Sequence, residues 1–375
     1  MASRRTRLLV PGFAFCAVLF VTATFAADSK PVREFDVSVP DLYERADFPP
    51  GPYGIKYLAA NQLAIWFTDN TAGELSRRGQ LRATDPWRLK LHIIDTSTGA
   101  ARNVEWPTHK ISNGVQVQAD GTVVVLNGPV VRCLSPDLKQ FGSVELPDLA
   151  RHSDERILAA SPGGRSAWVF DSADQIGLIR VDTSACKLTA NLRMSLSATS
   201  LSASDDLLVA TDSTHIGVRA LKSNWAPIYQ PESCCVGGAT FANQSTVIAF
   251  HEERNLEKGE TNTNLLLLDP RGKLLLETPM EKNYKPGSIV SSSTGQFALV
   301  VTFKPQSSTE ILRYQLLTAK YRLVIYDLRS LRRVAQIDVS RNNAGIFVPT
   351  ISPDGRQAAV LVGSKVFIYD IPPSR

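Results

Sequence analysis

Cysteine and histidine are both scarce in this chain, with five of each among 375 residues. The cysteines form no Cys-x-x-Cys pair, the spacing that many zinc sites and redox motifs use, so neither kind of site has support. One short stretch, His251-Glu252-Glu253, begins like a zinc-protease motif, but Asn255 stands where the second histidine is required. We therefore expect no metal ion and no cofactor.

Motifs of nucleophilic and phosphate-binding enzymes are absent as well. No Gly-x-Ser-x-Gly elbow occurs, and Gly237-Gly238 precedes an expected strand rather than the helix that a phosphate-binding loop needs. Acidic residues are common, but turn Asp residues that bond to neighbouring backbone groups account for most of them. No catalytic residue is assigned, and whether the protein is an enzyme stays open.

A strong excess of one charge is also missing. The chain has 41 basic and 36 acidic residues, and Arg4, Arg5 and Arg7 lie in an N-terminal segment that we expect to be removed. Without them the excess is two positive charges, whereas a nucleic-acid surface needs a larger and clustered excess. The sequence therefore predicts no nucleic-acid partner.

The N-terminal segment has the layout of a secretory signal peptide. Its arginines precede an apolar run over residues 8–25, and Ala26 and Ala27 supply the small residues that cleavage requires. We expect residues 1–27 to be the signal peptide and residues 28–375 to be an exported domain, periplasmic or secreted, with no integral membrane span after cleavage. An uncleaved membrane anchor is the alternative, because the run is nearly long enough to span a bilayer.

A short pattern recurs along the whole of that domain. Each copy has a strand end followed by a tight turn, as in Ile351-Ser-Pro-Asp-Gly355, and then an apolar run such as Ala358–Val362. A third strand ends in Asp, and a fourth strand follows. The recurring position is occupied by Asp95, Asp182, Asp269, Asp327 and Asp370, with Ser135 and Leu221 in the two units that fit least well.

Seven such units follow one another, with a spacing of about 40–60 residues. No long amphipathic helix interrupts them, and Gly and Pro punctuate the chain throughout. Because repeated four-stranded sheets pack radially around a channel, the predicted fold is all-β, a seven-bladed β-propeller of four-stranded antiparallel blades. A double-sheet sandwich is the alternative, although it would not need the repeat. The units span approximately residues 53–107, 108–147, 148–193, 194–232, 233–280, 281–341 and 342–371.

The last two units carry the clearest motifs, ISPDGR with VFIYDI in the seventh and LVIYDLRSLRRVAQIDV in the sixth. They resemble the WD-repeat and related secreted propeller families, and the resemblance covers essentially all of residues 28–375. It departs from true WD repeats, because the Gly-His dipeptide is missing and Tyr326-Asp327 and Tyr369-Asp370 replace Trp-Asp. The resemblance implies an architecture, and an architecture does not define a function.

The seventh unit has only three strands before the chain stops, which would leave an open sheet edge. At the other end, Val32–Pro40 belongs to no unit, alternates apolar with charged or small residues, and looks like the fourth strand Arg333–Ser340 of the sixth unit. We therefore expect Arg33–Val39 to form the outermost strand of the last blade, beside Val366–Ile371. With the ring closed in this way, we expect a monomer.

Four cysteines remain once the signal peptide is removed. Cys133 lies within the apolar strand Val130–Leu134, which predicts a buried free thiol. We interpret the adjacent Cys234 and Cys235 as thiols on opposite sides of a strand. A vicinal disulfide is the alternative, and pairing of Cys186 with one of these two stays open.

Three connections between second and third strands are long: Asp69–Pro86, Glu252–Thr263 and Lys304–Ala319, in units one, five and six. In a closed ring of seven these units lie in one arc, 5-6-7-1, and their connections share one face. Long connections are often functional, and two of these contain capping-box spacings typical of a short helix. The predicted binding face of this insertion arc consists of Glu74, Arg77, Arg78, Arg82, Trp87, His251, Glu252, Arg254, Arg313 and Tyr314.

The leading hypothesis for function is an exported propeller that acts as a ligand-binding or protein-binding module. One alternative is a propeller enzyme of the lactonase, lyase or quinone-dependent dehydrogenase type, with its site at the mouth of the channel. The other is a cell-envelope scaffold without a small ligand. Acidic residues and a histidine that converge on a bound cation would favour the enzyme. An apolar or aromatic rim would favour the binding module, and a broad flat surface would favour the scaffold.

Overall fold

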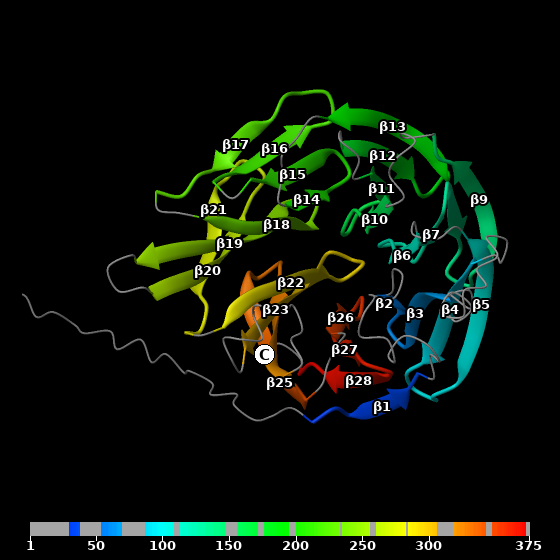
Figure 1. The fold of residues 1–375 in the computed structure, drawn as a ribbon. Coiled ribbons are helices and arrows are strands. Elements are labelled where there is room, and N and C mark those ends of the chain that lie inside the picture. Colours follow the sequence, from blue (N-terminus) through cyan, green and yellow to red (C-terminus); the bar gives the residue numbers. More distant parts are fainter. Residues whose placement is uncertain are drawn as a thin grey trace, which may run out of the picture.

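Seven four-stranded antiparallel sheets form a ring, and each sheet is one blade of a β-propeller (Figure 1). This confirms the predicted fold class. No helix in the part of the chain that the structure describes is long and apolar enough to cross a membrane. The structure is a computed structural model that describes residues 30–37, 54–69, 87–108, 113–147, 156–171, 176–194, 200–212, 214–232, 235–255, 260–282, 284–305, 318–342 and 347–372.

Blades 1 to 4 follow one another along the chain, and each begins with its innermost strand. Blade 1 contains β2 (Gly54–Ala59), β3 (Gln62–Asp69), β4 (Trp87–Asp95) and β5 (Ala101–Thr108). Blade 2 contains β6 (Asn113–Val117), β7 (Val123–Asn127), β8 (Val130–Leu134) and β9 (Gln140–Glu145). Blade 3 contains β10 (Arg156–Ala160), β11 (Ser166–Asp171), β12 (Ile176–Asp182) and β13 (Lys187–Met194). Blade 4 contains β14 (Ser200–Ala203), β15 (Leu207–Thr211), β16 (Ile216–Ala220) and β17 (Ala226–Tyr229).

The remaining blades complete the ring. Blade 5 contains β18 (Val236–Asn243), β19 (Thr246–Asn255), β20 (Glu260–Leu268) and β21 (Leu274–Pro279). Blade 6 contains β22 (Lys285–Ser291), β23 (Phe297–Pro305), β24 (Thr318–Asp327) and β25 (Arg332–Asn342). Blade 7 contains β26 (Phe347–Ile351), β27 (Gln357–Val362), β28 (Lys365–Asp370) and, from the other end of the chain, β1 (Arg33–Asp36).

Burial explains why these segments form strands of different character. Every residue of the second strand β7, with the sequence VVVLN, is buried because its blade is covered by a neighbour on each face. The outermost strand β9 instead alternates exposed and half-buried residues, as expected where one edge meets solvent. The apolar core is therefore a series of layers between blades rather than one central cluster.

Four of the five recurring Asp residues accept hydrogen bonds from backbone N–H groups of the turn that follows them, as the sequence predicts, whereas Asp370 accepts one from the Gln357 side chain. Asp95 accepts hydrogen bonds from the backbone N–H groups of Ser97 and Thr98, at 2.8 and 2.9 Å. The hydrogen bond from the Ser97 hydroxyl is the main reason that the pKa of Asp95 is lowered to about 2. In blade 2 the Ser135 hydroxyl takes this place and accepts the N–H of Lys139 at 3.2 Å.

The ring is closed by the two ends of the chain. Strand β1 pairs antiparallel with β28, with Arg33 opposite Ile368 and Phe35 opposite Val366. Beyond the strand, the Val37 N–H donates to the carbonyl oxygen of Ser364 at 2.7 Å, and the Val37 side chain is buried in the core between blades 7 and 1. The predicted closure is confirmed for residues 33–37, and residues 38 and 39 lie outside the described part.

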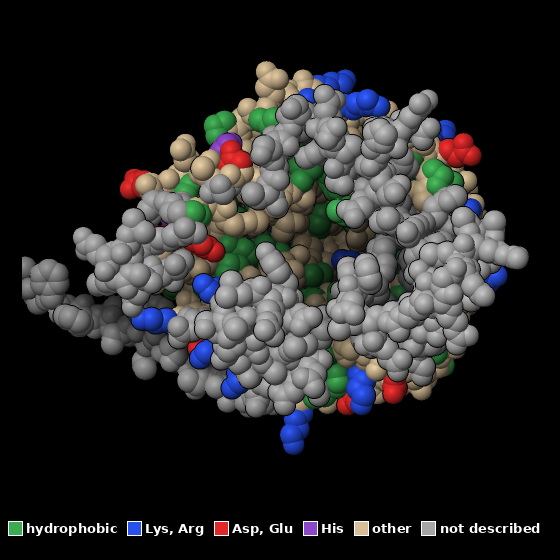
Figure 2. Space-filling model, in the orientation of Figure 1, with side chains coloured by type: hydrophobic (Ala, Val, Ile, Leu, Met, Phe, Trp, Pro, Cys, Tyr) green, Lys and Arg blue, Asp and Glu red, His purple; other side chains and the backbone are tan. Residues whose placement is uncertain are grey.

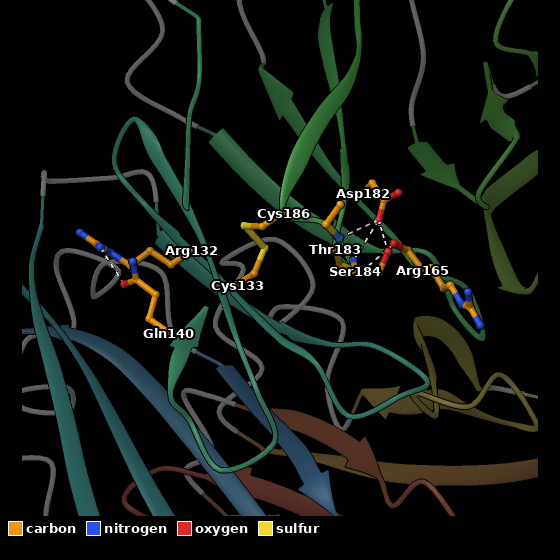
Figure 3. The surroundings of a disulfide bond; sticks show 9 residues. Arg132, Cys133, Gln140, Arg165, Asp182, Thr183, Ser184 and Cys186 are labelled. Atoms are coloured by element: carbon orange, nitrogen blue, oxygen red, sulfur yellow. Dashed lines mark hydrogen bonds between the residues drawn. A yellow bond between two sulfur atoms is a disulfide. The ribbon is translucent and has the colours of Figure 1, made fainter. Parts of the chain in front are cut away.

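The cysteines differ from the prediction. Cys133 of β8 is buried, but it forms a disulfide with Cys186 in the turn between β12 and β13, so it is not a free thiol (Figure 3). The bond joins blades 2 and 3, and the two Cα atoms are 5.8 Å apart. Sequence periodicity places Cys133 in a core strand but does not reveal which residue of the next blade faces it. Cys235 is also disulfide-bonded, which overturns its interpretation as a thiol, and Cys234 lies outside the described residues.

Removing the closing strand should destabilise the whole ring. We expect a chain that begins at residue 41 to melt roughly 5–10 °C below one that begins at residue 28. The longer chain keeps the β1–β28 pairing and the buried Val37, whose burial alone contributes about 1.5–3 kcal/mol. Thermal unfolding followed by circular dichroism, with light scattering to detect association through the exposed edge of β28, tests this. Equal melting temperatures and two monomeric products would contradict closure as a source of stability.

Candidate functional site

The predicted insertion arc is only partly described by the structure. Of its three long connections, the one over residues 252–263 is mostly regular strand, because β19 and β20 continue as a hairpin that pairs Glu252 with Thr263 and Asn255 with Glu260. This corrects the expectation of a long loop in blade 5. Residues 70–86 and 306–317 of the other two connections lie outside the described residues, and with them the two short helices expected there.

The ten predicted site residues fall into three groups. Trp87 begins β4 and Arg254 lies in β19. His251 and Glu252, also in β19, are described with their side chains. Glu74, Arg77, Arg78, Arg82, Arg313 and Tyr314 lie outside the described residues.

His251 and Glu252 have different surroundings. The His251 side chain is buried, and its ring meets that of Tyr229 edge-on with centroids 6.1 Å apart. The half-buried Glu252 has its backbone N–H bonded to the carbonyl oxygen of Cys235 at 2.9 Å. His251 therefore has a packing contact within blades 4 and 5, and only Glu252 of this pair meets solvent to a substantial degree.

A cavity of about 350 Å³ lies within the same arc, between blades 5 and 6. We call it the interblade cleft. Its apolar lining comes from strands of both blades and from the linker that joins them, whereas its polar lining is concentrated in blade 6. The lining residues are Leu265, Thr278, Pro279, Met280, Glu281, Tyr284, Val300, Thr302, Arg322, Val324, Tyr326, Arg333 and Gln336.

Arg322 is a polar group of the cleft with contacts on several sides. Its Nε and Nη2 atoms donate to the two carboxylate oxygens of Asp338 at 2.6 and 3.1 Å, a bidentate arrangement that fits the planar guanidinium. Nη1 bonds to Glu281, and the guanidinium carbon lies 4.3 Å from the ring centroid of Tyr284. Four groups from β24, β25 and the linker between blades 5 and 6 thus hold one another in place.

Local strand geometry explains this arrangement. Arg322 and Asp338 are directly opposite each other in the β24–β25 ladder, where facing side chains of opposite charge pair readily. Tyr321 and Leu323, which flank Arg322 in sequence, point to the other face of the sheet and pack in the core between blades 6 and 7. Alternation along β24 therefore directs the guanidinium toward blade 5.

Two tyrosines of the cleft are kept in their neutral form over a wide pH range. Burial raises the pKa of Tyr284, and the charge of Asp338 raises it further. Burial likewise raises the pKa of Tyr326, against the opposing effects of the Arg333 charge and the Thr278 hydroxyl. The cleft therefore offers neutral aromatic surface beside a charge-paired guanidinium.

This arrangement suits binding better than proton transfer. Arg322 is already neutralised by two carboxylates, and neither tyrosine has a pKa moved toward neutrality. No three His, Cys, Asp or Glu side chains come together to hold a metal ion anywhere in the described ranges. The sequence pointed to units 1, 5 and 6, but it did not reveal the cleft, because the walls of the cleft are contributed by two blades.

Breaking the Arg322–Asp338 pair should cost more than breaking an exposed pair. We expect Asp338→Ala to lower the free energy of unfolding by about 1–3 kcal/mol, because it leaves a guanidinium with only 13% of its side chain exposed without its bidentate partner. Glu105→Ala, which breaks the Arg88–Glu105 pair with side chains 53% and 46% exposed, should cost less than about 1 kcal/mol. Urea unfolding of both variants gives the comparison, and equal losses would contradict a structural role for the pair.

Comparisons with known proteins identify the architecture. No protein-family model and no curated protein matches the sequence. Among solved structures, a chain of a mitotic checkpoint complex is similar with a TM-score of 0.54 and 11% identity, covering 100% of this chain and 99% of that one. The β-propeller domain of Myceliophteria thermophila Cps50 (Swd1) has a TM-score of 0.53 and 13% identity, covering 92% and 100%. The WD40 domain of Neurospora crassa Pan2 has a TM-score of 0.52 and 10% identity, covering 93% and 97%. The chain is therefore a seven-bladed β-propeller with the fold of the WD-repeat-like propellers.

Proposed function

We propose that this protein is an exported interaction module whose partner is another protein, bound at the interblade cleft of blades 5 and 6. The observation that carries the proposal is the cleft itself, an apolar cavity beside a guanidinium held rigidly by Asp338, Glu281 and Tyr284. Concave apolar sites with a few well-placed polar groups are the usual sites of recognition. The WD40 fold of the solved relatives is compatible with such a role but does not by itself assign it.

The size and charge of the cleft indicate the kind of segment that it binds. A volume of about 350 Å³ is small, enough for one aromatic or aliphatic side chain with its flanking backbone. Arg333 is exposed at the rim and donates to Gln336 at 3.4 Å, so its charge is available to an acidic group. The partner segment therefore presents a large apolar residue next to Asp or Glu.

The cleft lies on the face that the insertions mark. Strands β19, β20, β23 and β24 are nine or ten residues long, whereas the corresponding strands of blades 2, 3, 4 and 7 have five to seven. The connections between β19 and β20 and between β23 and β24 lie on one face of the ring. The end of β21 and the linker of Met280 to Tyr284 lie on the same face. A partner seated in the cleft would therefore reach the insertion arc, where loops on a rigid scaffold can contribute further contacts.

Two observations support export. The N-terminal segment has the layout of a signal peptide, and a buried disulfide joins blades 2 and 3. Disulfides persist in oxidising compartments and are rare in the reducing cytosol. Both features suit a protein that acts outside the cytoplasm.

Site-specific crosslinking tests the docking site. We expect a photoreactive phenylalanine analogue at Gln336 to capture one partner, and the same analogue at Phe141 of blade 2, whose side chain is 50% exposed, to capture none. Met280→Glu should reduce the crosslinked product at least about tenfold, because it places a charge where the apolar residue of the partner would be buried. Arg333→Glu should reduce it similarly, because the ion pair with the acidic residue of the partner is lost. Arg193→Glu on β13, an exposed position of blade 3 outside the insertion arc, is the matched control and should leave the amount of crosslinked product unchanged. Capture that is the same at both positions, or insensitive to the cleft variants, would show that the cleft is not the docking site.

Export has its own test. The protein purified from its native host without reductant should begin at Asp28 by N-terminal sequencing and should yield a linked peptide pair containing Cys133 and Cys186 by mass spectrometry. Recovery from the cytosol as a chain with an intact N-terminus and reduced cysteines would refute export. It would leave the docking site to be judged by the crosslinking result alone.

A further inference from the structure

The walls of the central channel have an unusual charge composition. They are formed by the seven innermost strands, β2, β6, β10, β14, β18, β22 and β26, which contact one another around the ring. These strands contain Lys56, Arg156 and Lys285 but no Asp or Glu. The outermost strands hold acidic residues instead, among them Glu34, Glu105, Glu145, Glu277 and Asp338.

Lys56 is the charged residue of β2, the inner strand of blade 1, and its side chain is half-buried. It lies in the middle of β2, between Ile55 and Tyr57, which are both buried in the core between blades 7 and 1. Figure 2 looks into the central hollow, where most of the wall that is visible between the grey residues is apolar or uncharged and some Lys or Arg surface also shows.

Within the described residues, no carboxylate, hydroxyl or carbonyl group is bonded to the Lys56 ammonium. The flanking strands β6 and β26 contain no titratable residue, and β3 contains only Asp69, at its far end, while Lys56 is opposite Ala64. The ion pairs among the described residues involve third and fourth strands, linkers and turns, and none involves an inner strand. Loss of hydration without a compensating charge lowers the pKa of Lys56 to about 8.

The channel is narrowed at the end where first and second strands are joined. The Gly163 N–H of blade 3 donates to the Ser293 carbonyl of blade 6 at 3.1 Å, and Thr294 of blade 6 donates to the Pro353 carbonyl of blade 7 at 2.9 Å. The Gln244 amide of blade 5 donates to Pro162 of blade 3 at 2.8 Å. Turns from blades 3, 5, 6 and 7 are therefore locked together across this end of the ring, which suits a pocket better than a passage.

We propose that the central channel binds a small monocarboxylate with an apolar body, and that Lys56 is its anchoring cation. The ligand carboxylate supplies the charge that the channel walls lack, and its body lies against the apolar walls. One uncompensated ammonium balances one negative charge, which favours a monocarboxylate over a phosphate dianion. Hydroxyls that blades 4 and 5 contribute to the inner strands are engaged already, since Ser200 bonds to Thr211 and Thr240 to Ser202, so a highly polar ligand would find few partners there.

The proposal also predicts a dependence on pH. The ammonium is mostly protonated at pH 7, and a bound carboxylate raises its pKa again, so binding is strongest below about pH 8. As the pH rises further the lysine loses its proton, and the affinity should fall by about tenfold per pH unit. The ligand carboxylate itself is ionised throughout this range.

Titration calorimetry on the mature chain tests the site with defined probes: benzoate, its neutral analogue benzyl alcohol, and inorganic phosphate. We expect benzoate to bind the wild-type protein at least about tenfold more tightly than either of the others. Lys56→Met, which removes the charge and keeps most of the length of the side chain, should weaken benzoate binding at least about tenfold, and Lys56→Arg should retain most of the affinity. Lys285→Met is the matched control, because this exposed lysine begins the inner strand β22 and should not matter.

A second measurement needs no variant. In the wild-type protein, benzoate should protect Lys56 but not Lys285 from acylation by a neutral reagent, as read from peptide masses. The proposal is wrong if benzoate binds no better than benzyl alcohol, if it leaves Lys56 unprotected, or if folded Lys56→Met binds it as the wild type does. Tighter binding of phosphate than of benzoate would also overturn the monocarboxylate assignment.

Discussion

The pairing of β1 with β28 is the interaction on which the rest of the molecule depends. A blade of four strands has two apolar faces, and both are buried only if a neighbour stands on each side. In a closed ring every one of the seven blades has a neighbour on both faces. In an open ring the first and the last blade would each leave one apolar face exposed. The N-terminal strand supplies the last edge, and Val37 extends it into the core between blades 7 and 1, so the two ends of the chain are held together by main-chain hydrogen bonds and by packing.

In the closed ring, charged residues are rare in the inner strands and common in the outer strands. Inner strands lie inside the ring, where burying an unpaired carboxylate or ammonium is costly, and only three charged residues occur in them. Outer strands meet solvent and carry cross-strand pairs such as Arg88–Glu105 and Arg322–Asp338. Against this background the Lys56 ammonium stands out, because it is half-buried and the strands beside it, β3, β6 and β26, contain no acidic residue apart from Asp69 at the far end of β3.

The interblade cleft and the disulfide have a common origin, since both are formed where one blade meets the next. The cleft is lined by long strands of blades 5 and 6, which reach beyond the length of the corresponding strands in blades 2, 3, 4 and 7, and by the linker between these two blades. The disulfide exists because the turn after β12 places Cys186 beside Cys133, over Gly142, where a side chain would meet the Cys186 Cβ atom. Neither feature is a property of a single blade.

Sequence alone determined the repeat, the number of blades, the strand order within each blade and the closure by the N-terminal strand. These follow from local signals: period-two alternation, turn residues such as Pro353-Asp354-Gly355, the recurring Asp, and one orphan strand that matches one missing strand. The tertiary structure decided what lies between blades: the partner of Cys133, the burial of His251, the extended hairpin over residues 252–263, and the grouping of Arg322, Glu281 and Tyr284. The physical reason is that pairing within a blade depends on residues close in sequence, whereas contacts between blades depend on the twist and stagger of whole sheets, which no local pattern records.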